Sequence, residues 1–239
     1  MNGRTHAAIG LTVPLGALAT GTPVTEVTLI AAVATAFAIA PDIDHPNSTI
    51  SRALPRGTHR LALEMCDLFW KVTATGRDQR GALAAPGCED PAARLHRTFT
   101  HTALAAVAAA GMAYAIGHLW YGAAALAALC LYSCRTLVPR RFRPALIGGA
   151  VAAVFFAWKV PISPAHLAMA AGTGWMSHVL ADACTTRGVP MLWPLTIKGK
   201  RWWYIRALGS WLRSGEKKER LAACGVAFVT NLPYLMLAG

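Results

Sequence analysis

Charged residues are scarce in this 239-residue chain, at 14%, and acidic ones are scarcest, with 11 Asp and Glu against 23 Lys and Arg. A soluble domain usually carries about 25% charged residues. The shortage, together with 55% hydrophobic residues, argues against an ordinary soluble domain and favours a lipid environment. A C-x-x-C pair is also missing among the six cysteines, and no disulfide framework is indicated.

The net charge of +12 raises the possibility of a nucleic-acid binder. The basic residues, however, lie between apolar runs and do not follow one continuous face. Cytoplasmic loops of membrane proteins collect Lys and Arg in this way. We therefore expect a membrane protein and no nucleic-acid partner.

Apolar segments predict an all-α, polytopic membrane helix bundle with about seven apolar helices plus interfacial helices. Most of the segments are shorter than the roughly 20 residues that cross a bilayer comfortably. With the N-terminus in the cytoplasm, the basic linkers 42–101, 135–144 and 184–220 all fall on the cytoplasmic side. The segments are 7–20, 27–41, 102–117, 119–134, 145–158, 165–183 and 221–238.

The whole chain, 1–239, is expected to form a single integral membrane domain. A polar cytoplasmic insertion covers about 46–95, and a basic interfacial segment covers about 187–220. Arg4 followed by an apolar run also resembles a signal peptide, whose cleavage would remove His6. The sequence leaves the oligomeric state open.

Two apolar stripes predict helices at the membrane surface. The first has helical spacing and consists of Leu61, Met65, Leu68 and Val72. The second, within 198–214, is surrounded by Lys and Arg and consists of Trp202, Ile205, Leu208, Gly209 and Leu212. Trp and Arg together are typical of the headgroup zone. The second stripe indicates either contact with anionic phospholipid headgroups or plain anchoring.

Histidine and aspartate residues gather at the ends of apolar segments. In the topology above all of them lie on the cytoplasmic side, so they can meet at one end of a helix bundle although they are far apart in sequence. Ionisable groups in such positions are costly and usually functional. The eight residues are His6, Asp42, Asp44, His45, His96, His101, His178 and Asp182.

His178 and Asp182 are at positions i and i+4 of a predicted helix, so both point the same way. That spacing suits two ligands of one metal ion, although a simple His–Asp hydrogen bond would also satisfy both groups.

The Asp42-Ile43-Asp44-His45 turn offers carboxylates that can bind metal ions and an imidazole that suits zinc or manganese. The two aspartates alternate, so we expect one to be a ligand and the other to support a ligand from behind. Alternatively, Asp44 caps a following helix.

His96 and His101 are five residues apart, and Arg97 beside them could bind a substrate phosphate or extend to lipid headgroups. Three other histidines are not accompanied by further His or Asp residues of this group. We interpret His59 as part of a loop surface, and His118 and His166 as polar residues at extracellular helix ends.

Four blocks of this sequence resemble the YdjM family of bacterial inner-membrane proteins, which are described as metal-dependent hydrolases. The resemblance implies a membrane-bound hydrolase, and it includes His6 among the site residues. The blocks are Gly3 to His6 with the following apolar run, Pro41 to Ser48, His96 to Thr102, and His178 to Asp182 continuing to Gly188–Pro194.

We therefore expect one or two divalent ions, zinc or manganese first, bound by residues from the eight above. Bound metal would supply hydroxide at neutral pH, Asp42 could accept a proton, and Arg97 could hold the phosphate of a phospholipid or another amphiphilic ester. Alternatives are a transporter that uses the same cluster, and a non-catalytic scaffold with a structural metal.

Overall fold

The computed structural model describes residues 3–19, 21–83, 95–145, 148–149, 151, 162–207 and 218–238. Within these ranges the chain is helical, and β structure is limited to two isolated bridges, Val189 with Ile205 and Ile197 with Lys200. The predicted all-α class is confirmed.

The first predicted apolar segment is divided into two helices, α1 (Gly3–Gly10) and α2 (Val13–Ala19). Pro14 lies in the first turn of α2, where its missing N–H is tolerated. Inside a continuous helix its ring would collide with the carbonyl group of Gly10, so the chain breaks at Leu11 and Thr12.

The other apolar segments correspond to single helices, except that segment 145–158 lies largely outside the described residues. Helix α3 (Val24–Ile39) continues into the 3-10 turn η1 (Ala40–Asp44). A second 3-10 turn, η2 (Phe99–His101), leads into α8. The remaining helices are α8 (Ala103–Gly117), α9 (Gly122–Cys134), α11 (Pro164–Ala183) and α12 (Lys218–Ala238), and the short turn η3 (Arg140–Phe142) follows α9.

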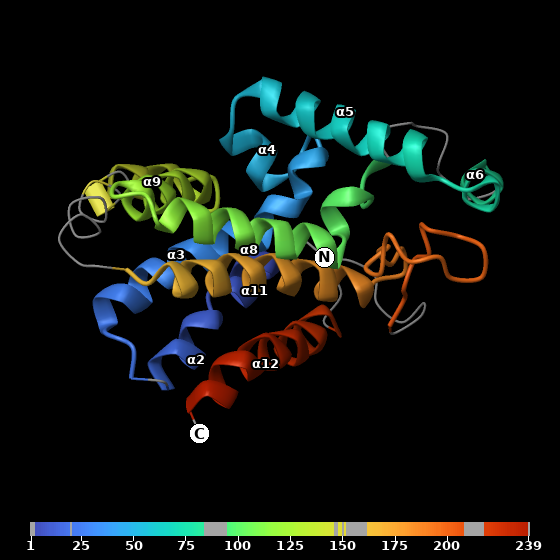
Figure 1. The fold of residues 1–239 in the computed structure, drawn as a ribbon. Helices are drawn as coiled ribbons and strands as arrows, with labels where there is room; N and C mark the ends of the chain where they lie inside the picture. The colour runs from blue at the N-terminus through green and yellow to red at the C-terminus, as the bar shows by residue number, and fades with distance from the viewer. Residues whose placement is uncertain are drawn as a thin grey trace.

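Helices α3, α8 and α11 form a central layer, with α2 and α12 on one side and the polar insertion on the other (Figure 1). The insertion consists of α4 (Thr49–Ala53), α5 (Arg56–Thr73) and α6 (Gly76–Leu83). The Ser48 hydroxyl accepts a hydrogen bond from the Ser51 amide and caps α4, so the alternative in which Asp44 caps a helix is wrong. His59 is not on a loop but within α5, with Nδ1 3.0 Å from the Ile43 carbonyl oxygen.

Two glycines allow α1 and α11 to approach α3 very closely at Ala34. A Cβ atom on Gly174 would come within 2.4 Å of the Ala34 carbonyl oxygen, and one on Gly10 within 2.8 Å of it. About one helical turn away, at a distance of four residues, each helix carries a residue near the site. These residues are His178 on α11, His6 on α1 and Ala38 on α3. The tight backbone packing therefore brings the two imidazoles to the end of α3.

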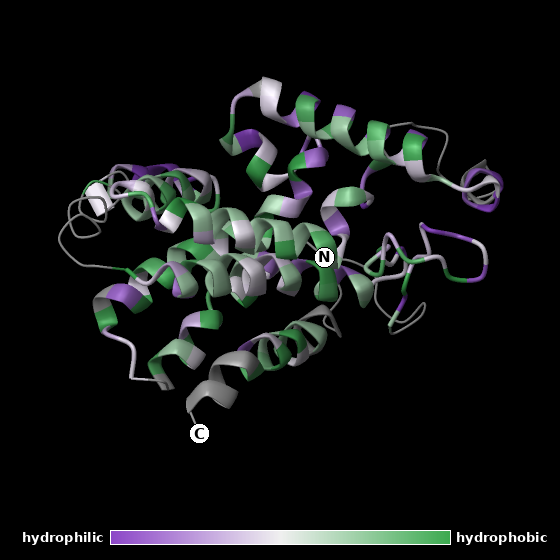
Figure 2. Ribbon diagram, in the orientation of Figure 1, coloured by the Kyte–Doolittle hydropathy of each residue, from purple (hydrophilic) through white to green (hydrophobic). Residues whose placement is uncertain are grey.

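Only part of the predicted membrane topology has structural support. Among the described residues, the helix Glu26–Asp44 alone is long and apolar enough to cross a membrane, and Ala103–Gly117, Gly122–Cys134 and Ala222–Leu232 are apolar but shorter. Helix α11 is longer but carries polar residues such as His166, His178 and Asp182. Figure 2 shows hydrophobic residues dominating α3, α8 and α11, and hydrophilic residues around α6 and the loop near residue 200.

The second apolar stripe does not form the predicted interfacial helix over residues 198–207, and 208–214 lie outside the described residues. Trp202 is only 2% exposed, its ring stacks on Trp193, and its backbone amide donates to Asp78. Gly188 has φ +68°, and a side chain there would collide with the Ile205 carbonyl oxygen. This segment is therefore a compact loop held against α6, with Trp202 in its interior.

Candidate metal centre

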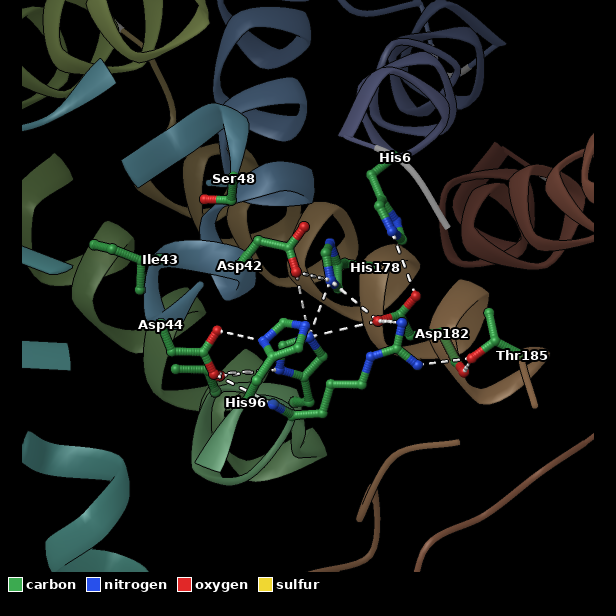
Figure 3. Close-up of polar contacts among 12 residues, drawn as sticks. His6, Asp42, Ile43, Asp44, Ser48, His96, His178, Asp182 and Thr185 are labelled. Carbon is green, nitrogen blue, oxygen red and sulfur yellow. Dashed lines mark hydrogen bonds and ion pairs between the residues drawn. The ribbon is translucent and has the colours of Figure 1, made fainter. Parts of the chain in front are cut away.

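Four side chains from distant segments meet where α3, η2 and α11 end (Figure 3). Asp42 comes from η1, His101 from η2, and His178 and Asp182 from the last turns of α11. Each offers one ligand atom, and these atoms all lie within 4.8 Å of one another. Three of the side chains are buried, whereas that of Asp42 is 18% exposed and forms the accessible side of the cluster.

The spacing of these atoms matches the first coordination shell of a metal ion. His101 Nε2 lies 3.6 Å from Asp42 Oδ1 and 3.5 Å from Asp182 Oδ2. His178 Nε2 lies 3.4 Å and 3.7 Å from the same two oxygens. Ligands about 2.1 Å from a tetrahedral ion are about 3.4 Å apart, so the four His–Asp distances are close to the length that a zinc-like ion requires.

Hydrogen bonds fix the tautomer of both histidines. His178 Nδ1 is 2.8 Å from the Ala38 carbonyl oxygen, which can only accept, so Nδ1 carries the proton. The Thr100 hydroxyl donates to Asp44 Oδ2, and it therefore accepts from His101 Nδ1 at 2.9 Å. In their neutral forms both histidines consequently direct the Nε2 lone pair at the cluster, which is the form in which imidazole binds a metal ion.

These two Nε2 atoms are only 3.2 Å apart. Two facing lone pairs repel each other at that distance unless a positive charge, either a proton or a metal cation, lies between them. Burial opposes protonation of His101, but its contacts with Asp182 and Asp42 overcome this effect and raise its pKa to about 9. Without a metal ion a proton on His101 therefore supplies this positive charge, and a bound metal cation would take its place.

Asp182 joins two parts of the site. Its Oδ2 faces the four-residue cluster and lies 3.0 Å from Arg97 Nη2, while its Oδ1 lies 3.5 Å from His6 Nε2. The His6 ring stacks on His178 with centroids 3.7 Å apart, and neither of its nitrogens has a hydrogen-bond partner among the described residues. Burial and the neighbouring His178 lower the pKa of His6 to about 4, so its imidazole is neutral.

Arg97 points into the protein. Its φ of +66° lies in the left-handed region, which is costly for a residue with a side chain. The guanidinium group is held by Asp182 and by the Thr185 hydroxyl, which is 2.7 Å from Nη1. Arg97 therefore lies beside the site and does not extend to lipid headgroups.

Asp44 does not belong to the four-residue cluster and lies in an adjoining network. It is fully buried and accepts hydrogen bonds from the Thr100 hydroxyl and the Arg97 backbone amide, while its Oδ1 is 2.8 Å from His96 Nδ1. The Cys66 thiol lies 4.0 Å away, and burial together with Asp44 raises its pKa to about 11. Asp44 thus positions His101 indirectly, because it holds the Thr100 hydroxyl that accepts a hydrogen bond from His101 Nδ1.

The structure thus groups Asp42, His101, His178 and Asp182, with His6 and Arg97 in contact with Asp182. His96 lies with Asp44, whereas His45 packs edge-on against His96 and accepts from the Asn47 amide. Sequence reasoning missed Thr100 and Thr185. Thr100 lies beside His101 in the sequence, and that adjacency was the only available signal.

These features define an all-helical protein with a buried His and Asp cluster at the end of an apolar helix layer. The sequence profile of the family described as YdjM inner membrane protein matches residues 1–237, and the chain belongs to this family. No curated protein and no solved structure matches the chain.

Proposed function

We propose that this protein is a membrane-bound hydrolase that holds a divalent cation between Asp42, His101, His178 and Asp182 and cleaves an amphiphilic phosphoester. The observation that carries the proposal is the pair of histidines whose Nε2 atoms face each other at 3.2 Å while both Nδ1 atoms are engaged elsewhere. A metal ion that displaced the proton between these two nitrogens would find both lone pairs directed at the same point.

Charge balance supports one divalent ion. With the histidines neutral, as metal ligands must be, the carboxylates of Asp42, Asp44 and Asp182 and the guanidinium of Arg97 leave a formal charge of −2 in the site. A buried net charge is expensive, and one divalent cation cancels it. Two imidazole and two carboxylate donors suit zinc or manganese.

A divalent cation held there would lower the pKa of a water molecule toward about 7 and polarise a phosphoryl oxygen. Asp42 is the exposed member of the cluster, so water and substrate would enter on its side, and its second oxygen can accept a proton. Arg97 is positioned by Thr185 next to the cluster and would attract an anionic group. These features favour a phosphoester over a neutral ester.

The membrane setting supports an amphiphilic substrate. The chain belongs to a family of inner membrane proteins, and the candidate span Glu26–Asp44 contains both Asp42 and Asp44. A reaction centre at the end of a membrane helix lies near the level of lipid headgroups. A phospholipid is the substrate class that brings a phosphoester to that level.

The test combines metal analysis with turnover on the purified full-length protein in lipid nanodiscs. We expect about one zinc or manganese ion per chain in the wild type, its loss in His178→Ala, and its retention in His118→Ala, a matched change at the far end of α8. The loaded wild type should hydrolyse phospholipid or a model phosphodiester. Absence of metal from folded wild type, after incubation with either ion, would refute the proposal.

A structural cation is the second candidate, because three of the four side chains are almost completely buried. Structural metal sites are closed, whereas catalytic sites keep a position open for water. This alternative predicts bound metal and a lower unfolding temperature on chelation, with no turnover on any phosphoester.

A further inference from the structure

His6 is a buried histidine whose two ring nitrogens both lack a hydrogen-bond partner among the residues that the structure describes. Burial lowers its pKa to about 4, so the imidazole is neutral and has one N–H group and one lone pair. Buried polar groups are nearly always hydrogen-bonded, because burial removes them from water and an unmade bond is costly. A group bound at His6 would remove this cost, and the surroundings indicate which group it is.

The Nε2 atom of His6 faces Asp182 Oδ1 (Figure 3). The two atoms are 3.5 Å apart, which is longer than the about 2.9 Å of a typical N–H···O hydrogen bond. Two ligands about 2.1 Å from a tetrahedral ion are about 3.4 Å apart, so this separation suits a shared metal ion better than a hydrogen bond. Imidazole nitrogen and carboxylate oxygen are also donors that zinc and manganese accept.

The carboxylate of Asp182 presents the same arrangement on its other side. Its Oδ2 lies 3.7 Å from His178 Nε2 within the four-residue cluster, as its Oδ1 lies 3.5 Å from His6 Nε2. A carboxylate can give one oxygen to each of two metal ions. Asp182 can therefore bridge two ions, with Oδ2 in the first site and Oδ1 in the second.

The stacking of His6 on His178 sets the distance between two such ions. The ring centroids are 3.7 Å apart, and the ring planes are inclined by only 18°. A metal ion lies in the plane of the imidazole that binds it. Because both Nε2 atoms face the same carboxylate, two nearly parallel rings place their ions about as far apart as the rings themselves. Hydrolytic two-metal sites have ions about 3.5–4 Å apart, and the stack has this spacing.

The charges of the site indicate when a second ion would bind. One divalent cation already balances the carboxylates and Arg97, so another would leave two positive charges uncompensated. A hydroxide ion and the phosphodiester group of a substrate, with one negative charge each, would restore neutrality. His6 and Asp182 are only two protein ligands, which leaves positions for water and phosphoryl oxygens. The second ion should therefore bind weakly alone and more tightly with an anion.

We propose that a second divalent cation, manganese or zinc, binds between His6 Nε2 and Asp182 Oδ1 together with the phosphoryl group of the substrate, so that Asp182 bridges a two-metal centre. This inference rests on the proposed function, because the first ion is bound at Asp182 Oδ2. It gives His6 a role that the first site does not supply. The phosphoryl group would be held between two cations, which favours a phosphoester as the substrate class.

Manganese binding to the full-length protein in detergent tests the second site without any measurement of turnover. The loss of the electron paramagnetic resonance signal of free Mn²⁺ counts bound ions, with and without inorganic phosphate as the probe, and a fluorescent chelator counts zinc in the same way. We expect the wild type to bind one ion alone and two with phosphate, which should tighten the second ion at least about tenfold. Two manganese ions about 3.5–4 Å apart should also give a spin-coupled spectrum at low temperature.

Two variants of His6 assign the second ion to this residue. His6→Phe keeps a ring that can stack on His178 but offers no ligand atom, so it should bind one ion whether or not phosphate is present. His118→Ala, an exposed change at the far end of α8, is the control and should match the wild type. His6→Leu gives the same comparison with a smaller side chain if His6→Phe does not fold. The unfolding temperature without metal identifies the folded variants.

The outcomes distinguish the second site from the first. A wild type that binds one ion even with phosphate, or a second ion that persists in His6→Phe, would overturn the two-metal centre while the single-ion hydrolase remained. Loss of both ions from folded His6→Phe would make His6 a ligand of the first ion and would overturn the second site too. Failure of the wild type to bind either metal would refute the proposed function, and the second site with it.

Discussion

The buried carboxylates of Asp44 and Asp182 lie in adjoining parts of the site. They differ in what surrounds them. Asp44 is surrounded by donors that need an acceptor, namely the Thr100 hydroxyl, the Arg97 amide and His96. Asp182 pairs with Arg97 and also faces the Nε2 atoms of His101 and His178. The first carboxylate completes a hydrogen-bond network, whereas the second also borders two imidazole nitrogens that can bind a metal ion. Burial alone therefore does not identify a ligand, whereas the type of neighbour does.

Metal removal should produce the largest effect. A ligand at a thousand times its dissociation constant stabilises the folded state by about 4 kcal/mol. We expect a chelator to lower the unfolding temperature of the metal-loaded wild type in detergent, and to leave that of His178→Ala unchanged. Equal shifts in both proteins would mean that the chelator acts elsewhere and that the contrast between the two carboxylates is wrong.

Substitution of Asp182 by Asn should produce the next largest effect. The change keeps the shape and removes the charge that faces the two histidines, so metal affinity should fall by more than about 100-fold, beyond the range of supporting residues. Competition with a fluorescent chelator measures it. Glu26→Gln is the control, because Glu26 is also buried and contacts His166 at the other end of α11. An equal loss in both variants would indicate a general electrostatic effect.

Asp44→Asn should have a smaller effect on the metal, about 10-fold to 100-fold in affinity, because Asp44 acts on His101 through Thr100. The same variant should lose about 1–3 kcal/mol of stability, since an amide cannot accept from every donor now directed at the carboxylate. Chemical denaturation of the metal-free protein measures that loss. Complete loss of metal would instead place Asp44 among the ligands.

The smallest change we predict is at Thr100. Thr100→Val keeps the volume but removes the acceptor for His101 Nδ1, and it should weaken metal binding about tenfold. Thr100→Ser retains the hydroxyl and should restore affinity to near the wild-type value. If serine fails to rescue, the methyl packing of Thr100 matters more than its hydrogen bonds.

Local patterns in the sequence predicted part of this arrangement. The i, i+4 spacing of His178 and Asp182 places both on one helix face, and the spacing from Leu61 to Val72 indicates the amphipathic helix that α5 forms. The same reasoning was wrong at Trp202, because an apolar stripe does not reveal whether tertiary packing will cover it. The inward direction of Arg97 and the role of Thr100 depend on contacts between distant segments, which periodicity does not contain.

The bond between His178 and the Ala38 carbonyl oxygen gives the site a dependence on helix register. Gly174 and Ala34 set how closely α11 and α3 approach, and one turn later a main-chain oxygen of α3 orients the imidazole of α11. A slide of α11 by a single residue would turn His178 away by about 100° and dismantle the cluster. A cation bound there would act as a cross-link between chain-distant segments, fixing the alignment of the bundle much as a disulfide fixes two strands of chain.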